Sequence, residues 1–172
     1  TDGSGKARTD YDSIIVVAKD SPLRDFDDLK ARASELRFCF ASPTSTSGYI
    51  MPYWRFVNEG MLQPRQDPKA IFKSVSFGGG YTQALEQVLA GRADVAAVSD
   101  YVLEGKSVDV YLKPEQRAQL RILARTSGVP THLICARAGL DEEVKAAVKS
   151  ALLKISREHP ELLADVYGAS EF

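Results

Sequence analysis

The residues best suited to chemistry lie together in one short polar loop. Hydroxyl side chains follow one another in Thr44-Ser45-Thr46-Ser47-Gly48, directly before a segment with the apolar spacing of a helix. Backbone amides in the first turn of a helix lack partners inside that helix and carry a positive partial charge. Such amides, with adjacent hydroxyls, can bind a tetrahedral oxyanion without lysine or arginine. The alternative is that Ser45 or Thr46 only caps the helix.

The sequence does not contain the residue patterns of common catalytic or metal sites. Asp27-Asp28 and Glu142-Glu143 are adjacent pairs, which point to different sides of a helix and are typical of solvated acids. Gly78-Gly79-Gly80 is not followed by the Lys-Ser/Thr of a P-loop. Cys39 and Cys135 form no CxxC pair, although a single bridge between them remains possible. We therefore predict a protein that is not an enzyme and that needs neither metal nor cofactor.

Apolar runs and helical spacing predict the elements that position the polar loop. We expect strands over residues 14–18, 37–41, 74–77, 94–99 and 133–136, and helices over 25–33, 49–59, 82–90 and 141–159. Strands that alternate with helices predict an α/β fold, with a mainly parallel sheet of about five strands flanked by helices on both faces. Ligands of such sheets bind beyond the carboxyl ends of the strands, which is where the polar loop is expected.

Trp54 lies within the helix expected over residues 49–59. Its spacing from Ile50 and Val57 places the three side chains on one helical face, which predicts that Trp54 packs into the core. Truncation of a buried tryptophan to alanine costs about 3–5 kcal/mol, so Trp54 is expected to contribute strongly to stability.

Composition and charge exclude several classes of partner. The 172 residues carry 22 basic and 23 acidic side chains, interspersed, with a formal net charge of -1. No basic face suited to nucleic acid is visible. No apolar run approaches the roughly 20 residues of a membrane-spanning helix, so no direct membrane insertion is expected. The chain begins at Thr1 without an initiator methionine or a signal-peptide pattern, from which we expect a processed or truncated sequence.

A longer motif around the polar loop resembles a known family. Residues 40–52, FASPTSTSGYIMP, closely resemble the signature of the phosphonate-binding family, periplasmic substrate-binding components of ABC transporters. The similarity continues through residues 14–22, 28–30, 78–80 and 91–97, and it covers nearly the whole chain. In that family two α/β lobes of the type II periplasmic-binding-protein fold clamp the ligand. The resemblance implies a linker or frayed terminus at residues 1–10, the second lobe at 11–138, and C-terminal helices at 139–172 that pack at the hinge or on a first lobe.

The resemblance also implies the ligand and the residues around it. A small phosphorus oxyanion, such as a phosphonate, phosphite or phosphate, would be held by the loop from Thr44 to Gly48, through the hydroxyls and amides of its serines and central threonine. Tyr81 stands where the family usually carries a histidine, and Tyr101 and His132 stand where it usually offers carboxylates. Asp100 is the nearest remaining acid. We expect these four residues to complete the site, and the departures to change which oxo-species binds.

The family resemblance leaves two alternatives open. Most members of the family deliver their ligand to a membrane permease, and we expect a periplasmic or lipid-anchored extracytoplasmic protein. A related branch binds arsenite and signals to a sensor kinase, although Cys39 and Cys135 lie in predicted strands and are expected to be inert. An effector-binding domain of a transcription regulator can share the two-lobed architecture, and it would require a helix-turn-helix before Thr1.

Overall fold

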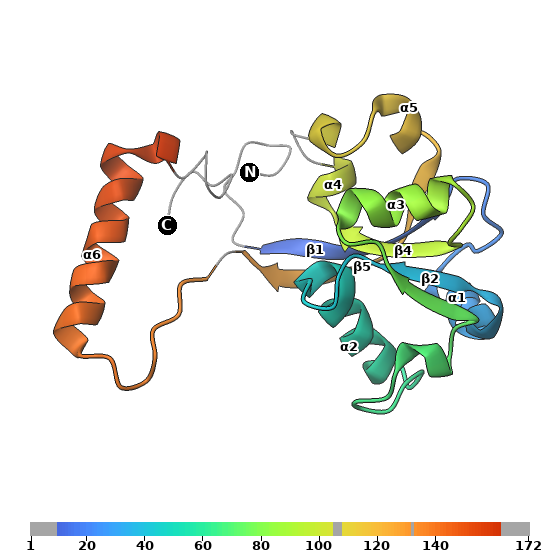
Figure 1. Ribbon diagram of the computed structural model, residues 1–172, viewed down its shortest axis with the longest axis horizontal. Helices are drawn as coiled ribbons and strands as arrows, with labels where there is room; N and C mark the ends of the chain where they lie inside the picture. The colour runs from blue at the N-terminus through green and yellow to red at the C-terminus, as the bar shows by residue number, and fades with distance from the viewer. Residues whose placement is uncertain (1–9, 105–107, 132, 163–172) are drawn as a thin grey trace. The chain divides into compact units, whose positions relative to one another are not determined.

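The computed structural model describes residues 10–104, 108–131 and 133–162, which fall into two compact units. The first unit ends at Val129 and contains a five-stranded sheet with its helices (Figure 1). The second begins at Pro130 and contains α6 (Glu142–Glu158), capped at its start by Asp141. Every residue expected in the ligand site, His132 excepted, belongs to the first unit. His132 lies outside the described residues.

The sheet is mixed, with the strand order β3-β2-β4-β1-β5. Its strands are β1 (Asp10–Ala18), β2 (Arg37–Phe40), β3 (Ser74–Phe77), β4 (Val95–Ser99) and β5 (Leu120–Pro130). β2 pairs in parallel with both β3 and β4, whereas β1 pairs antiparallel with β4 and places Ser13 opposite Ser99. The predicted α/β class is confirmed, with parallel pairing among β2, β3 and β4 and an antiparallel β1 that the prediction did not include. A strand buried on both faces has the same apolar run in either direction, so the sequence pattern did not reveal the antiparallel pairing.

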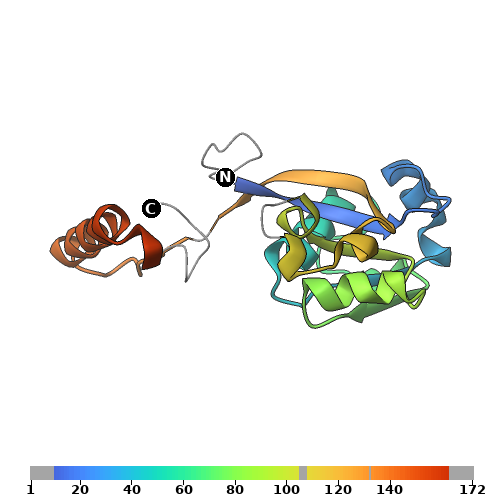
Figure 2. The same cartoon turned by 90° about the horizontal axis from the view of Figure 1, so that it is seen from above.

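The fifth strand was predicted in the wrong segment. Residues 133–136 are not a strand, and Leu133 and Ile134 are 70% and 55% exposed. β5 instead precedes them at the edge of the sheet beside β1, where Lys19 N donates to Gln119 O over 2.8 Å (Figure 2). An edge strand is partly solvated, so β5 tolerates arginine, threonine and serine and lacks the continuous apolar run that the prediction sought.

Helices cover both faces of the sheet (Figure 1). They are α1 (Phe26–Arg32), α2 (Met51–Asn58), α3 (Tyr81–Leu89), α4 (Tyr101–Glu104) and α5 (Pro114–Arg117), with short turns at Ala33–Glu35, Pro68–Ala70 and Val108–Val110. Alternate residues of β1 face opposite layers: Ile15 packs with α1 and α2, and Ile14 packs with α3 and α4. This period of two, together with helices on both sides, buries β1 and β4 completely at their centres.

α2 turns a different face to the core from the one predicted. Phe56 is fully buried beside Phe26 and Phe38, whereas Trp54 is 53% exposed and Ile50 is 47% exposed. The prediction that Trp54 is a core residue is therefore wrong. α2 and the turn before it carry large apolar side chains on most of their circumference, so spacing alone does not say which stripe faces the sheet.

Candidate functional site

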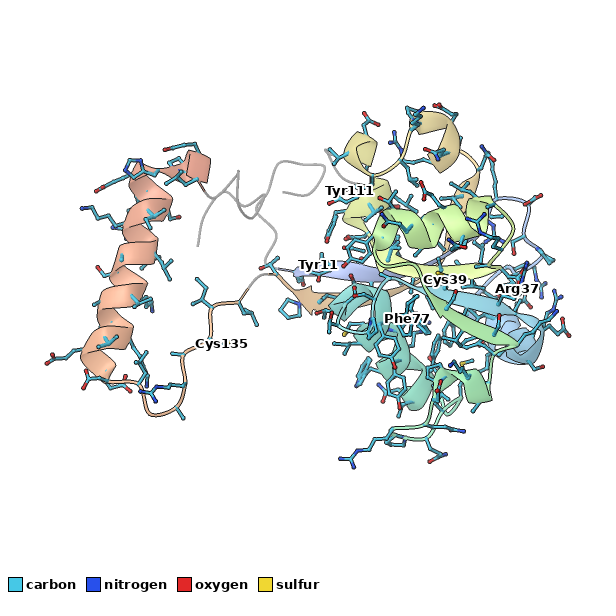
Figure 3. The ribbon with its side chains drawn as sticks, in the orientation of Figure 1. Tyr11, Arg37, Cys39, Phe77, Tyr111 and Cys135 are labelled. Carbon is cyan, nitrogen blue, oxygen red and sulfur yellow. The ribbon has the colours of Figure 1, made fainter. Side chains whose placement is uncertain are left out.

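Four chain segments meet at one edge of the sheet because of the strand directions. The carboxyl ends of the parallel strands β2, β3 and β4 lie there, and the antiparallel β1 contributes its amino end. Figure 3 shows Tyr11, from the start of β1, and Tyr111 at this end of the first unit, with Arg37 at the opposite end. The polar loop, the glycine turn after β3 and the Asp100-Tyr101 segment after β4 therefore share an edge.

The polar loop runs directly into a helix, as predicted. A π-helical turn over Thr46–Ile50 continues into α2, and Ser45 caps it by accepting a hydrogen bond from Gly48 N over 3.0 Å. The capping role weighed for Ser45 is thus confirmed. Helix geometry leaves the amides of Thr46 and Ser47 without partners inside the helix. Thr44 and Thr46 are exposed, so their hydroxyls and the adjacent helix start face solvent at the sheet edge.

Gly48 allows the helix to begin in contact with the sheet. A Cβ at this position would lie 2.8 Å from Ser45 Oγ and 3.2 Å from Ala97 O, and it would overlap the Ala41 side chain. The backbone is fastened to the same strands: Ala41 N donates to Gly48 O over 3.1 Å. The loop therefore takes its position from buried backbone contacts with β2 and β4.

Tyr81 joins the glycine turn to the polar loop. Its Oη lies 2.8 Å from Ser47 Oγ, and Ser45 Oγ donates to it over 3.3 Å. Tyr81 is the first residue of α3, and Gly79 before it has φ +96°, a left-handed conformation that favours glycine. The turn thus starts α3 at the position from which its first side chain reaches two serines of the loop.

Aromatic rings form a cluster beside these hydroxyls, which we call the tyrosine cluster: Tyr11, Tyr81, Tyr101 and Tyr111. The Tyr101 ring lies at its centre, with centroid distances of 5.5 Å to Tyr11, 6.0 Å to Tyr81 and 5.9 Å to Tyr111. Burial, and then the neighbouring tyrosine Tyr81, raises the pKa of the Tyr11, Tyr101 and Tyr111 phenols. These groups therefore present uncharged hydroxyls and ring surfaces at neutral pH.

Asp100 is the acid of this edge. It is 3% exposed, its amide donates to Asp12 O over 3.0 Å, and Ser99 Oγ donates to its Oδ1 over 3.5 Å. Arg125 lies close by on β5 and pairs with Asp12, 3.5 Å away, and with Glu104. Asp100 is thus buried among polar groups next to the exposed ring of Tyr101.

The structure brings the predicted loop, Tyr81, Asp100 and Tyr101 to one edge, and it adds residues that the sequence analysis missed. Tyr11 and Ser13 were missed because a parallel β1 would have placed them at the opposite edge. Tyr111 was missed because it follows a polar stretch with no strong periodicity. That pattern does not show that Tyr111 is half-buried and that its ring contacts Tyr101.

The comparison with known proteins identifies the family. A family model described as ABC transporter, phosphonate, periplasmic substrate-binding protein matches residues 2–172. The chain belongs to this family. Phosphonate-binding family members are substrate-binding proteins of ABC transporters and not enzymes.

Individual relatives in the phosphonate-binding family are similar over most of the chain. The phosphonates-binding periplasmic protein of Escherichia coli is 29% identical over 136 residues, which are 78% of this chain and 37% of that protein. A binding protein component of an ABC phosphonate transporter from Pseudomonas aeruginosa is 26% identical, with a TM-score of 0.65 over 97% of this chain and 53% of its own. PhnD1 from Prochlorococcus marinus, solved with methylphosphonate, is 25% identical, with a TM-score of 0.67 over 95% of this chain and 61% of its own. The chain thus spans roughly a third to three fifths of these relatives.

Possible metal ligands and the two cysteines can be assessed among the residues that the structure describes. Within those residues no group of histidine, cysteine and acidic side chains is placed to hold a metal ion. Cys39 is a buried free thiol whose pKa is raised by burial, and Cys135 is an exposed free thiol. The bridge that the sequence left open is therefore not formed. Across the described helices, none has the length and apolar character needed to cross a membrane.

Proposed function

We propose that this protein is the extracytoplasmic substrate-binding component of an ABC transporter, and that it binds a small phosphorus oxyanion at the loop from Thr44 to Gly48. The observation that carries the proposal is the loop itself. Its hydroxyls and the first amides of the helix meet at the ligand-binding edge of the sheet, beside Tyr81. The oxyanion would be a phosphonate, phosphite or phosphate, and the partner would be the transporter's permease.

The loop can bind an anion through two sets of donors. The amides of Thr46 and Ser47 carry the positive end of the helix dipole, and the hydroxyls of the loop stand next to them. Hydrogen bonds from such donors to an ionised oxygen are charge-assisted and roughly twice as strong as neutral ones. No cationic side chain is required for this mode of binding.

The rest of the edge suits the remaining atoms of such a ligand. Asp100 can accept a hydrogen bond from the protonated oxygen of a singly protonated oxyanion, since a carboxylate has no proton to donate. Tyr101, 37% exposed, offers a ring surface and an uncharged hydroxyl. A solved relative holds methylphosphonate, an oxyanion that also carries an apolar substituent, which supports this choice of ligand class.

The second half of the site belongs to our proposal as well. We propose that residues 11–138 form one lobe and that residues 139–172 pack at the hinge or on a first lobe. The matched relatives are longer than this chain, which is consistent with a first lobe in those proteins. His132 is proposed to approach the ligand from the hinge. The apolar face of α6, where Val144 and Val148 are 45% and 46% exposed, is the surface that would pack there.

Arsenite is the less favoured ligand. Cys39 is fully buried, and its Sγ donates to Phe40 O over 3.6 Å within the layer that contains α3. Burial raises the pKa of this thiol and disfavours the thiolate that would bind arsenic. A sensor kinase partner has no support beyond the arsenite resemblance.

Calorimetric titration of the full protein tests the proposal. Methylphosphonate, phosphite, phosphate and arsenite are titrated in parallel at neutral pH and the same ionic strength. We expect saturable binding of at least one phosphorus oxyanion and weaker or absent binding of arsenite. A folded protein that ignores all three phosphorus oxyanions would remove this ligand class, and tight arsenite binding alone would favour the sensory alternative.

A further inference from the structure

Tyr81 engages the two serines that are placed to bind the anion. Ser45 Oγ accepts from Gly48 N over 3.0 Å and donates to Tyr81 Oη over 3.3 Å. Tyr81 Oη also lies 2.8 Å from Ser47 Oγ. A serine hydroxyl has one proton to donate. While Tyr81 stays in this position, the proton of Ser45 is therefore committed to the phenol and is not free for a ligand.

The position of Tyr81 is fixed by its surroundings and not by the two serines alone. Its ring stands perpendicular to that of Tyr101, with centroids 6.0 Å apart and planes at 82°. Its backbone begins α3, where Ala84 N donates to Gly80 O over 3.1 Å. The Tyr101 ring is in turn held between Tyr11 and Tyr111. The phenol is thus a half-buried group that occupies the serine hydroxyls from a defined direction.

We propose that Tyr81 is an internal competitor that lowers the affinity of the site, because its hydroxyl must be replaced at Ser45 and Ser47 by an oxygen of the ligand. This inference rests on the proposed binding of an oxyanion at the loop. It goes further because it names the side chain that sets an affinity threshold for every ligand of the loop.

The consequence is an affinity threshold, which an ionised ligand exceeds more readily than a neutral one. Hydrogen bonds from a hydroxyl to an ionised oxygen are about twice as strong as those to a neutral one, so an ionised phosphorus oxyanion gains free energy when it replaces the phenol. A neutral oxo-acid, such as arsenious or boric acid at pH 7, makes bonds no stronger than those of Tyr81. It therefore gains little from the exchange. The uncharged hydroxyls at this edge do not by themselves favour an uncharged ligand.

The Tyr81→Phe variant tests the competition directly. It keeps the ring and its perpendicular packing against the Tyr101 ring, and it removes the hydroxyl that contacts the two serines and the Tyr101 side chain. In calorimetric titrations of the full protein at pH 7, we expect Tyr81→Phe to bind methylphosphonate about tenfold more tightly than wild type, since the neutral hydrogen bonds no longer have to be broken. Arsenious acid should gain affinity by at least the same factor, so that discrimination between the two ligands does not increase.

The matched control is Tyr53→Phe on α2. It also removes a phenol hydroxyl, but this hydroxyl lies outside the loop and donates a 3.4 Å hydrogen bond to Gln63 O. It should bind both ligands as wild type does. A second measurement follows the phenol itself: in protein labelled with ¹³C at the ζ carbon of Tyr81, methylphosphonate should shift this resonance as the serine contacts are lost. This measurement does not depend on the folding of a variant.

Each outcome has a defined meaning. Weaker methylphosphonate binding by Tyr81→Phe would show that the phenol donates to the ligand, and unchanged affinity or an unmoved resonance would show that it does not compete. Either result overturns this inference while the proposed function stands, because wild type still binds. If folded wild type and Tyr81→Phe both fail to bind every phosphorus oxyanion, the proposed function fails and this inference fails with it.

Discussion

The hydroxyl of Ser13 donates a 2.6 Å hydrogen bond to the backbone carbonyl of Ser47, 34 residues further along the chain. Both residues are buried, and the bond joins the first turn of the helix at the polar loop to strand β1, which lies between β4 and β5. Strand β1 can reach the loop because it runs antiparallel to β4 and brings its amino end to the edge of the sheet where the polar loop lies. The position of the proposed anion site is therefore set partly by a residue outside the loop.

Replacement of Ser13 by alanine should destabilise the protein and weaken ligand binding. The carbonyl of Ser47 would lose its buried donor, which costs about 1–3 kcal/mol of the free energy of unfolding. Urea denaturation measures this change, and calorimetry measures the accompanying loss of methylphosphonate affinity. Ser13→Cys, which keeps a weak donor, should fall between alanine and wild type. Unchanged stability in Ser13→Ala would mean that the carbonyl finds another partner.

Simultaneous replacement of Ser45, Thr46 and Ser47 by alanine should nearly abolish binding. The backbone amides remain, but each lost charge-assisted hydrogen bond costs roughly 1.5–3 kcal/mol of binding free energy. Fold stability should fall much less, by about the 1 kcal/mol of one helix cap. The control is Ser74→Ala, at the exposed start of β3 and the opposite end of the strand from the glycine turn. A triple variant that binds as well as wild type would leave the loop as a helix cap only.

Gly48→Ala should displace the start of the helix. The added methyl group would overlap the Ala41 side chain and crowd Ala97 O. Such overpacking typically lowers the free energy of unfolding by about 1–3 kcal/mol, which thermal or urea denaturation measures. Ligand affinity should fall as well, because the first amides move with the helix. Gly139→Ala is the control, since a Cβ there meets nothing within 4 Å, and its effect should stay within about 0.5 kcal/mol. Equal effects of the two changes would contradict the close packing of the loop.

The neighbouring aromatic residues Phe56 and Trp54 on α2 should differ sharply in their contribution to stability. Phe56 is fully buried among Phe26, Phe38 and Phe72, so its truncation to alanine should cost about 3–5 kcal/mol. Trp54 is 53% exposed, and its truncation should cost less than about 1 kcal/mol, in contrast to the value expected from its helical spacing. Urea denaturation of both variants measures the difference, and a large cost for Trp54 would indicate that another part of the full protein covers it.

The ion pair between Arg37 and Asp94 should make stability depend on acid pH. Hydrogen bonds from the Arg37 side chain, at 2.7 and 3.0 Å, lower the pKa of Asp94 below its ordinary value. A depressed carboxyl pKa contributes stability that is present above the unfolded-state pKa, about 3.9, and that is lost as the pH falls through the lower folded-state pKa. In Asp94→Asn, the free energy of unfolding should therefore fall less steeply than in wild type as the pH is lowered from neutral to about pH 3. Denaturation curves that keep the wild-type pH slope would contradict this role.

The sequence alone determined the local features of this protein and its family. The motif at residues 40–52 identified the phosphonate-binding family, and the helices expected from residues 25 and 141 begin one residue later, after the caps Asp25 and Asp141. Four of the five strands were found: β1, β2 and β4 contain contiguous apolar residues, and β3 is the short segment directly before the glycine turn. These features depend on neighbours within a few residues, which a linear pattern records.

The tertiary structure decided the direction of β1, the place of β5, the buried stripe of α2 and the composition of the site's edge. Tyr11 and Ser13 reach the loop only because β1 pairs antiparallel with β4, and Tyr81 engages Ser45 and Ser47 only because the glycine turn brings α3 beside the loop. Strand direction and side-chain contact across long sequence separations depend on how the layers pack together. Periodicity is the same for either direction of a buried strand, so only the packed sheet distinguishes between them.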